Sequence, residues 1–63
     1  MNVSNIQRFR VGDMVRHPIT PATVMGRVMC IFMPLEEDRL WIEVEWVPNG
    51  ATSVHLQSDL RRL

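Results

Sequence analysis

The sequence predicts an all-β domain, a small five-stranded barrel that stays partly open, and three observations support this. Apolar and polar residues alternate over residues 24–32 and 40–47, which is the pattern of half-buried strands. Asn49-Gly50, a strong turn signal, then leads to a third alternating segment over residues 52–56. No segment repeats apolar residues at helical spacing over a dozen positions, so we expect at most one 3₁₀ turn. Five short strands are too few for two packed sheets, which leaves a small bent barrel.

The elements follow one another in short steps. Residues 1–8 are expected to form a flexible arm, and residues 9–63 the barrel domain. Gly12-Asp13 marks a turn, after which residues 14–17 form an extended segment. The other expected elements are a proline-bounded loop at residues 18–21, a polar hairpin loop at 34–39, a 3₁₀ turn at 57–59 and a closing strand at 60–63.

The chain is short enough that its own core is expected to give it little stability. A single domain of 63 residues buries only about 60% of the surface that its unfolded chain exposes. Cys30 is the only cysteine, which excludes an internal disulfide and is typical of a cytoplasmic protein. Cys30, His17 and His55 lack the spacing of a zinc site, and we expect neither a metal nor a cofactor. Self-association is then the expected source of extra stability.

Charge and hydropathy limit the classes of partner. Seven arginines balance seven acidic residues, which disfavours a protein that coats nucleic acid or an anionic membrane through its net charge. The longest apolar run begins at Val28 and is far too short to span a bilayer. The N-terminus lacks the apolar run of a signal peptide. We therefore expect no membrane partner.

The turn at residues 48–50 predicts how the strands on either side of it pair. A three-residue loop places apolar residues opposite apolar residues, with Val44 against Val54 as one such pair. A two-residue loop would set the same apolar residues against glutamates. We therefore expect the three-residue loop, with Val54 and Leu56 facing the core.

This register places a glutamate and a histidine opposite each other on the outer face of the sheet. Glu43 would lie directly across from His55, and a nearby carboxylate raises a histidine pKa by favouring the imidazolium. Such a pair is either an ordinary cross-strand contact or part of a ligand-binding surface, since histidine titrates near neutral pH. The ligand-binding candidates of this hairpin are Glu43, Ser53, His55 and Gln57.

The same outer face is expected to carry an apolar patch. Pairing across the preceding loop sets Ile31 opposite Trp41, with Met29 beside them. Exposed apolar patches mark interaction surfaces, and tryptophan and methionine are common in interface cores. The alternation also predicts that Cys30 and Phe32 face the core. We expect a homo-oligomer, or else another protein partner, with contacts from Met29, Ile31, Trp41 and Val47.

Arginines gather near both ends of the chain, which are expected to lie close together in a small barrel. Phosphate contacts from such arginines would give a nucleic-acid-binding module. The sequence has no tyrosine, and its few aromatic residues are expected in the core or the outer patch, so nucleic acid is not the favoured partner. The alternative is a solvated basic edge that prevents edge-to-edge pairing. The nucleic-acid candidates are Arg8, Arg10, Arg61 and Arg62.

Several short motifs resemble the SH3-like barrel group. They are Phe9-x-x-Gly12-Asp13-x-Val15-Arg16, Gly26, Val44-Glu45-Trp46 ahead of Asn49-Gly50, and the closing Leu60-x-x-Leu63. The resemblance spans residues 9–63 and implies a five-stranded SH3-like barrel. The function that we expect for this fold is that of a non-catalytic binding or assembly module of a small bacterial or mobile-element protein. The Tudor and KOW members of the group imply nucleic-acid binding as an alternative.

Within this group, the chain is also similar to the type II dihydrofolate reductase family. The matching pieces include Gly12-Asp13-x-Val15-Arg16 and Ser53-Val54-x-Leu56. In that homotetrameric family the strand matching Ser53 to Gln57 lines a central pore that binds folate and a nicotinamide cofactor. His55 stands where the family has glutamine, and Gln57 where it has tyrosine. The resemblance implies an oligomeric reductase as a further alternative, whereas we expect a binding module without catalytic residues.

Overall fold

The computed structural model describes residues 6–21 and 23–63, which form one five-stranded antiparallel sheet. The expected all-β class is confirmed, with one 3₁₀ turn, η2 (Gln57–Asp59), between the last two strands. No helix in these two stretches has the length and apolar character needed to cross a membrane. The strands are β1 (Met14–Arg16), β2 (Met25–Phe32), β3 (Trp41–Val47), β4 (Thr52–Leu56) and β5 (Arg61–Arg62).

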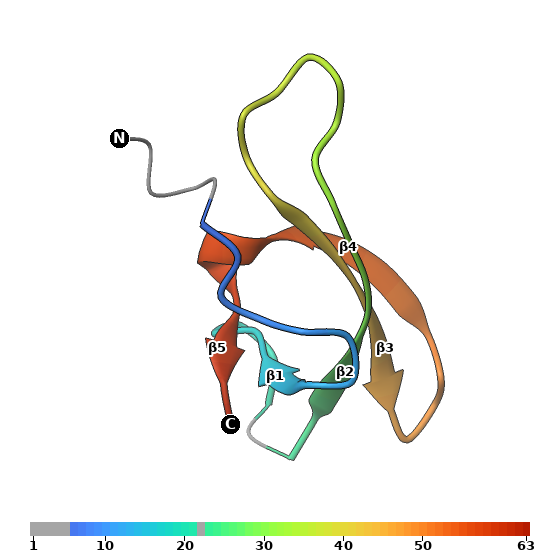
Figure 1. Ribbon diagram of the computed structural model, residues 1–63. Coiled ribbons are helices and arrows are strands. Elements are labelled where there is room, and N and C mark those ends of the chain that lie inside the picture. Colours follow the sequence, from blue (N-terminus) through green and yellow to red (C-terminus); the bar gives the residue numbers. More distant parts are fainter. Residues whose placement is uncertain (1–5, 22) are drawn as a thin grey trace.

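The sheet bends around its core without closing into a complete barrel. Its strand order is β4-β3-β2-β1-β5, and in the described part of the chain the edge strands β4 and β5 are joined through η2 and not by a ladder. Figure 1 shows the chain curving back on itself, with the β2–β3 loop projecting away from the body. The principal extents are 35 × 18 × 17 Å, and the projecting loop contributes to the longest of the three. A small open sheet of this shape is compatible with the SH3-like expectation.

The core is built from inward residues of the three central strands and two residues that flank the sheet. Along β3, buried Ile42 and Val44 alternate with more exposed neighbours, which is the expected period of two. Full burial of a side chain of this kind contributes about 1.5–3 kcal/mol. Ile31 and Trp46 pack against this core from its margin. The buried apolar side chains of the described chain are Phe9, Val15, Val28, Ile42, Val44 and Leu60.

A β-bulge in β2 overturns part of the expected pairing. Arg27 lies opposite Glu45 as expected, and the register holds as far as Val28. Between Val28 and Cys30 the pairing shifts by one residue, which leaves Met29 as the extra residue. An extra residue of this kind reverses the facing of every residue after it. The alternation in the sequence continues through the bulge and gives no sign of it.

Because of the bulge, the residues of β2 that follow it face the opposite way from the one expected. Ile31 pairs with Ile42 and packs against the core, so the expectation that it faces outward is wrong. Phe32 pairs with Trp41 on the outer face and is 39% exposed. Cys30 is also exposed. The inward placement expected for Phe32 and Cys30 is therefore wrong as well.

The β3–β4 turn has four residues, and the expected three-residue loop is wrong. The backbone N–H of Trp46 donates to the carbonyl of Ala51 at 2.7 Å, and the N–H of Gly50 donates to the carbonyl of Trp46 at 2.8 Å. The loop over residues 47–50 has a cis Val47–Pro48 peptide bond and a left-handed glycine, Gly50, at φ 75°. The added loop residue shifts the pairing of β4 by one position.

This shift turns the expected inner face of β4 outward. Glu43 lies opposite Val54, so the expected pairing of Glu43 with His55 is wrong. Ser53 and His55 take the inward positions, while Val54 is 46% exposed. Polar side chains are accommodated there because β4 is the open edge of the sheet and because Ser53 and His55 are hydrogen-bonded to each other.

The N-terminal segment is attached to the sheet through a buried glutamine. Gln57 is 3% exposed; its Nε2 donates to the carbonyl of Ile6 and its Oε1 accepts from the N–H of Arg8, both at 2.7 Å. This amide, expected as a ligand-binding group, is thus used inside the fold. Residues 1–5 of the expected flexible arm lie outside the described residues.

Candidate functional site

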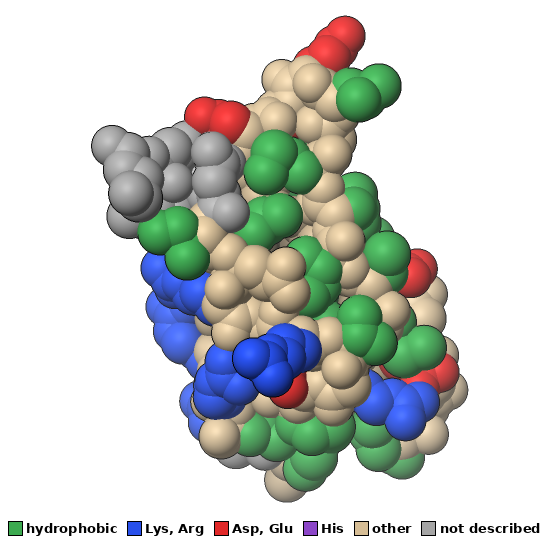
Figure 2. Space-filling model, viewed as in Figure 1, with side chains coloured by type: hydrophobic (Ala, Val, Ile, Leu, Met, Phe, Trp, Pro, Cys, Tyr) green, Lys and Arg blue, Asp and Glu red, His purple; other side chains and the backbone are tan. Residues whose placement is uncertain are grey.

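The fold brings four arginines from distant parts of the chain to one side of the molecule. Two pockets share Arg8, Phe9 and Arg62; Arg10 lines the first and Arg61 the second. Figure 2 shows basic side chains gathered over the N-terminal segment and β5. The four nucleic-acid candidates of the sequence therefore lie together. We call Arg8, Arg10, Arg61 and Arg62 the arginine site.

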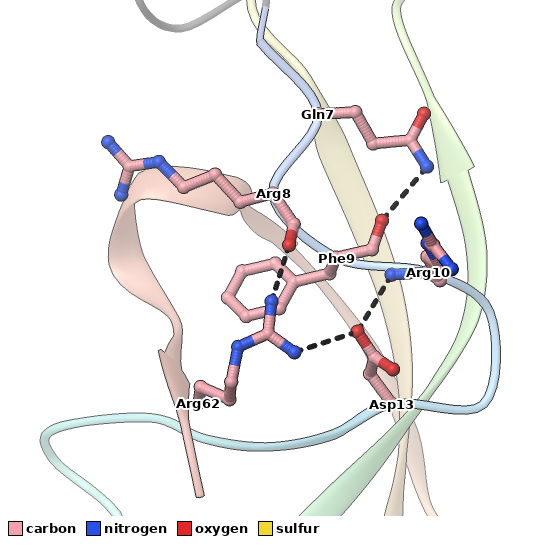
Figure 3. Close-up of a pocket in the computed structure, with 6 residues that line it drawn as sticks. All are labelled: Gln7, Arg8, Phe9, Arg10, Asp13 and Arg62. Carbon is pink, nitrogen blue, oxygen red and sulfur yellow. Dashed lines mark hydrogen bonds and ion pairs between the residues drawn. The ribbon is translucent and has the colours of Figure 1, made fainter.

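Arg62 is held in a fixed position at the centre of this site. Its guanidinium donates to Oδ2 of Asp13 at 3.1 Å and to the carbonyl of Arg8 at 2.5 Å. The guanidinium carbon also lies 5.1 Å from the centre of the Phe9 ring, within range of a cation–π contact. Figure 3 shows Arg62 between these three groups. The β1–β5 pairing, which sets Val15 opposite Arg62, places the side chain there.

Asp13 partly balances the charge of the site. Its Oδ2 accepts from the backbone N–H of Arg10 at 2.9 Å as well as from Arg62. The hydrogen bond from Arg10, followed by the bond to Arg62 and its charge, lowers the pKa of the Asp13 carboxyl. Among the described residues that line the two pockets, Asp13 alone is acidic, so the four arginines outnumber it.

The other arginines of the site are exposed, and two of them, Arg8 and Arg10, have guanidinium groups open to solvent. Those of Arg8 and Arg10 have no hydrogen bond or ion pair to the described residues, and Figure 3 shows them on either side of Arg62. Arg61 donates from Nη1 to the carbonyls of Ser58 and Leu60 at 3.1 and 3.2 Å. This arrangement leaves several N–H donors available to an anion from outside.

A second group of polar residues fills the inner side of the open edge. The indole N–H of Trp46 donates to Oγ of Ser53 at 2.7 Å, and this Oγ lies 2.7 Å from Nε2 of His55. While it accepts from Trp46, this hydroxyl can donate its own proton to Nε2 of a neutral His55 ring in the tautomer that leaves Nε2 unprotonated. The His17 ring centre lies 5.0 Å from that of His55. Sequence reasoning chose Ser53 and His55 but placed both on the opposite face.

The surroundings of His55 lower its pKa, so the expected rise is wrong. Partial burial is the largest cause, the charge of His17 adds to it, and Asp59 opposes both. Glu43 pairs with Val54 and is not the partner of His55. The neutral imidazole is thus the favoured form of this ring in the folded protein.

We predict that this histidine makes the protein less stable in mild acid. Because its folded-state pKa lies below the unfolded value of about 6.5, the unfolded chain takes up a proton first as the pH falls. The free energy of unfolding should be highest above about pH 6.5 and should decline as the pH falls toward the folded-state pKa, where this contribution levels off. Urea unfolding measured across this range checks the prediction.

Two histidine variants separate the causes of this pH dependence. His55→Gln should flatten the decline, whereas His17→Gln should leave the larger part in place, because burial outweighs the charge of His17. A His55→Gln protein that lost stability as steeply as the parent would contradict the prediction.

The outer face of the sheet carries residues in regular rows across its strands. The row nearest the β2–β3 loop is apolar and consists of Phe32, Trp41 and Leu56. The next row contains Glu43 between Cys30 and Val54. The following row holds the Arg27–Glu45 ion pair at 3.0 Å, and the last row pairs Met25 with Val47. We call Met29, Phe32, Trp41, Val54 and Leu56 the outer patch.

The outer patch contains only part of what the sequence suggested. Met29 and Trp41 were expected there, and Val47 lies on the same face in the last row. The predicted register missed Phe32 because of the bulge. It missed Val54 and Leu56 because of the longer turn, and no residue pattern on β4 marks that choice.

No relative helps to assign these surfaces. Neither the protein-family models nor the curated proteins match the sequence, and no solved structure matches the fold. Within residues 6–21 and 23–63, no group of three or more His, Cys, Asp or Glu side chains is placed to hold a metal ion. The surfaces that the fold exposes are therefore the basis for a function.

Proposed function

We propose that this protein is a non-catalytic binding and assembly module with an SH3-like architecture, in which the outer sheet face joins two copies of the chain. The observation that carries the proposal is the outer patch. Phe32 and Met29 of β2 are 39% and 40% exposed and Val54 of β4 is 46% exposed, with Trp41 of β3 on the same face between these two strands. Contiguous apolar surface of this kind is typical of an interaction site.

The rows of the outer face support a second copy as the partner. Apolar rows lie at both ends, and the charged Arg27 and Glu45 lie between them. In a two-fold face-to-face pair the same patch occurs on both subunits, so it must complement itself. Turning one copy by half a turn would set apolar row against apolar row and would bring Arg27 near the glutamates of its partner.

The small core gives such an assembly a physical benefit. Only six apolar side chains are buried in the described chain, whereas eleven large apolar side chains are exposed there. A domain of this size without a disulfide or a metal is commonly stabilised by association. Burying the outer patch would extend the apolar interior across the sheet.

Trp41 is already held in one orientation at the edge of the patch. Its indole N–H donates to Oε1 of Glu37 at 3.2 Å, and Glu37 is in turn paired with Arg39 at 2.7 Å. An ordered aromatic side chain loses little conformational freedom when a partner packs on it. The β2–β3 loop therefore holds Trp41 in place as a contact residue. Phe32 stays exposed beside it.

The assembly is tested by replacing Phe32, the more exposed of the two aromatic residues in the patch. Phe32→Ser should weaken self-association by at least about 30-fold, because a buried interface aromatic commonly contributes about 2 kcal/mol or more. Sedimentation over a concentration series would show the parent shifting from 7.3 kDa toward twice that mass and the variant staying at the lower value.

A matched control uses an apolar residue that lies away from the sheet. Ile19 is 86% exposed in the β1–β2 loop, so Ile19→Ser should leave the mass profile unchanged. Trp41→Ser should act like Phe32→Ser. A parent protein that stays at 7.3 kDa up to about millimolar concentration would exclude the assembly.

The reductase-like alternative has less support than a binding module. Ser53 and His55 match the strand that lines the pore in that family, but here both face inward and bond to each other, Ser53 also accepting from Trp46. Gln57, the third position of that strand segment, is buried and bonded to the N-terminal segment. These side chains are not directed into a pore that outer faces would form.

A further inference from the structure

We propose that the arginine site binds the phosphate backbone of double-stranded nucleic acid. This inference goes beyond assembly and uses a different surface, since the arginine site shares no residue with the outer patch. The arginine site would contact the regularly spaced phosphodiester groups of the backbone and would not contact the edges of the bases.

The convergence of like charges is the first reason for the proposal. Arg8 and Arg62 are separated by 54 positions in the sequence, yet they line the same two pockets. Arg10 and Arg61 extend this basic surface to either side. Gathering four guanidinium groups against one carboxylate is unfavourable unless an anion offsets it, and a phosphate does so well because arginine can bond it through two N–H groups.

The second reason is that the centre of the site is ordered before any ligand arrives. Asp13 and the ring of Phe9 fix the guanidinium of Arg62, while Arg8 and Arg10 leave theirs available on either side. Fixed donors lose less freedom on binding than mobile ones. Arg62 thus acts as a positioning residue, and its neighbours Arg8 and Arg10 supply the outward contacts.

The distribution of charge favours this side for an extended polyanion. The protein has no net charge, so the excess of arginine here is matched by acidic residues elsewhere. Such a polarised molecule presents its basic side to a polyanion and its acidic side away from it. The acidic residues away from the site include Glu36, Glu37 and Asp38 in the projecting loop and Glu43 and Glu45 on β3.

The lining favours a duplex over a single strand or a membrane. Phe9 is 4% exposed and lies beneath Arg62, so it is not a platform on which a base can stack. Leu60, the other large apolar residue of the lining, is 2% exposed and cannot insert into a lipid surface. What the lining offers outward is N–H donors, which suit a backbone whose bases are already paired.

Fluorescence anisotropy with a labelled duplex of about 20 base pairs tests the proposal. With phosphate contacts from Arg8 and Arg10, affinity should fall on the order of 10-fold between about 50 and 200 mM salt. Arg10→Gln should weaken binding about 5- to 10-fold at 0.1 M salt and lower the salt slope by about 1. Both effects should be the same for duplexes of unrelated sequence.

The matched control is an arginine at the other side of the molecule. Arg39→Gln changes the net charge by the same amount but lies in the projecting loop, where Arg39 pairs with Glu37. It should leave the affinity within about twofold. Circular dichroism should show both variants folded, since Arg10 and Arg39 are exposed.

Several outcomes would overturn the proposal. One is an equal loss of affinity in Arg10→Gln and Arg39→Gln, which would indicate attraction by net charge alone. Others are tenfold tighter binding of a single strand than of the duplex, or binding of vesicles rich in phosphatidylserine without binding of the duplex. The absence of any anisotropy change at low salt would equally exclude it.

Discussion

Gly26→Ala is expected to destabilise the fold by about 3 kcal/mol, because the added methyl group has nowhere to go. A Cβ at this position would overlap Cγ1 of Val44 and lie 2.8 Å from Cε3 of Trp46. Val44 is fully buried, so it cannot move aside without displacing the core. The loss is large for a chain of 63 residues, whose total stability is about 3–9 kcal/mol.

Gly50 provides the comparison for this substitution. It is open to solvent with nothing within 4 Å of an added Cβ, but its φ of 75° lies in the left-handed region. Gly50→Ala should therefore cost only about 1–2 kcal/mol of backbone strain. Urea unfolding of the two variants measures the difference. A smaller loss for Gly26→Ala than for Gly50→Ala would mean that Val44 and Trp46 yield easily.

Gln57→Leu is expected to lower the free energy of unfolding by about 2 kcal/mol, although leucine is similar in volume. The change leaves the N–H of Arg8 and the carbonyl of Ile6 without their partners. Leaving such backbone groups unsatisfied costs about 1–3 kcal/mol. Hydrogen exchange should show the amide of Arg8 losing its protection.

An exposed glutamine offers the matched control. Gln7 lies one position from Arg8, and among residues 6–21 and 23–63 its amide bonds only the nearby carbonyl of Phe9. Gln7→Leu should stay within about 0.5 kcal/mol of the parent. Equal stability losses for Gln7→Leu and Gln57→Leu would show that burial of the Gln57 amide has no special effect.

The strands and most of the core follow directly from the sequence. Alternation alone predicts Val28, Ile42 and Val44 as inward residues, because each position depends only on the period of its strand. The 3₁₀ turn after β4 is also confirmed. These features depend on neighbouring residues, so the local sequence pattern is enough to predict them.

The facing of several surface residues could not be predicted, because it depends on two single-residue additions. The bulge at Met29 reverses which side of the sheet the rest of β2 faces. The longer turn before Ala51 does the same for β4. Neither has a distinctive residue: Met29 continues the alternation, and Pro48-Asn49-Gly50 fits a loop of three residues or four. The expected outward facing of His55 is wrong for this reason.

The arginine site was partly predictable. The expected barrel places both chain ends together, and in the structure Arg8 and Arg62 are in contact. The contacts that order the site depend on tertiary packing, namely the ring of Phe9 beneath Arg62 and the buried amide of Gln57. A charge pattern predicts neither contact.

The link from Gln57 to the N-terminal segment also bears on how the chain folds. Its two hydrogen bonds close loops of 51 and 49 positions, and the bond from Arg62 to Arg8 closes one of 54. Contacts this distant carry a high loop-closure entropy and tend to form late on the folding pathway. We expect the central hairpins to form first and the two ends to dock last. The arginine site would then be complete only in the fully folded chain, so its capacity to bind would be a late product of folding.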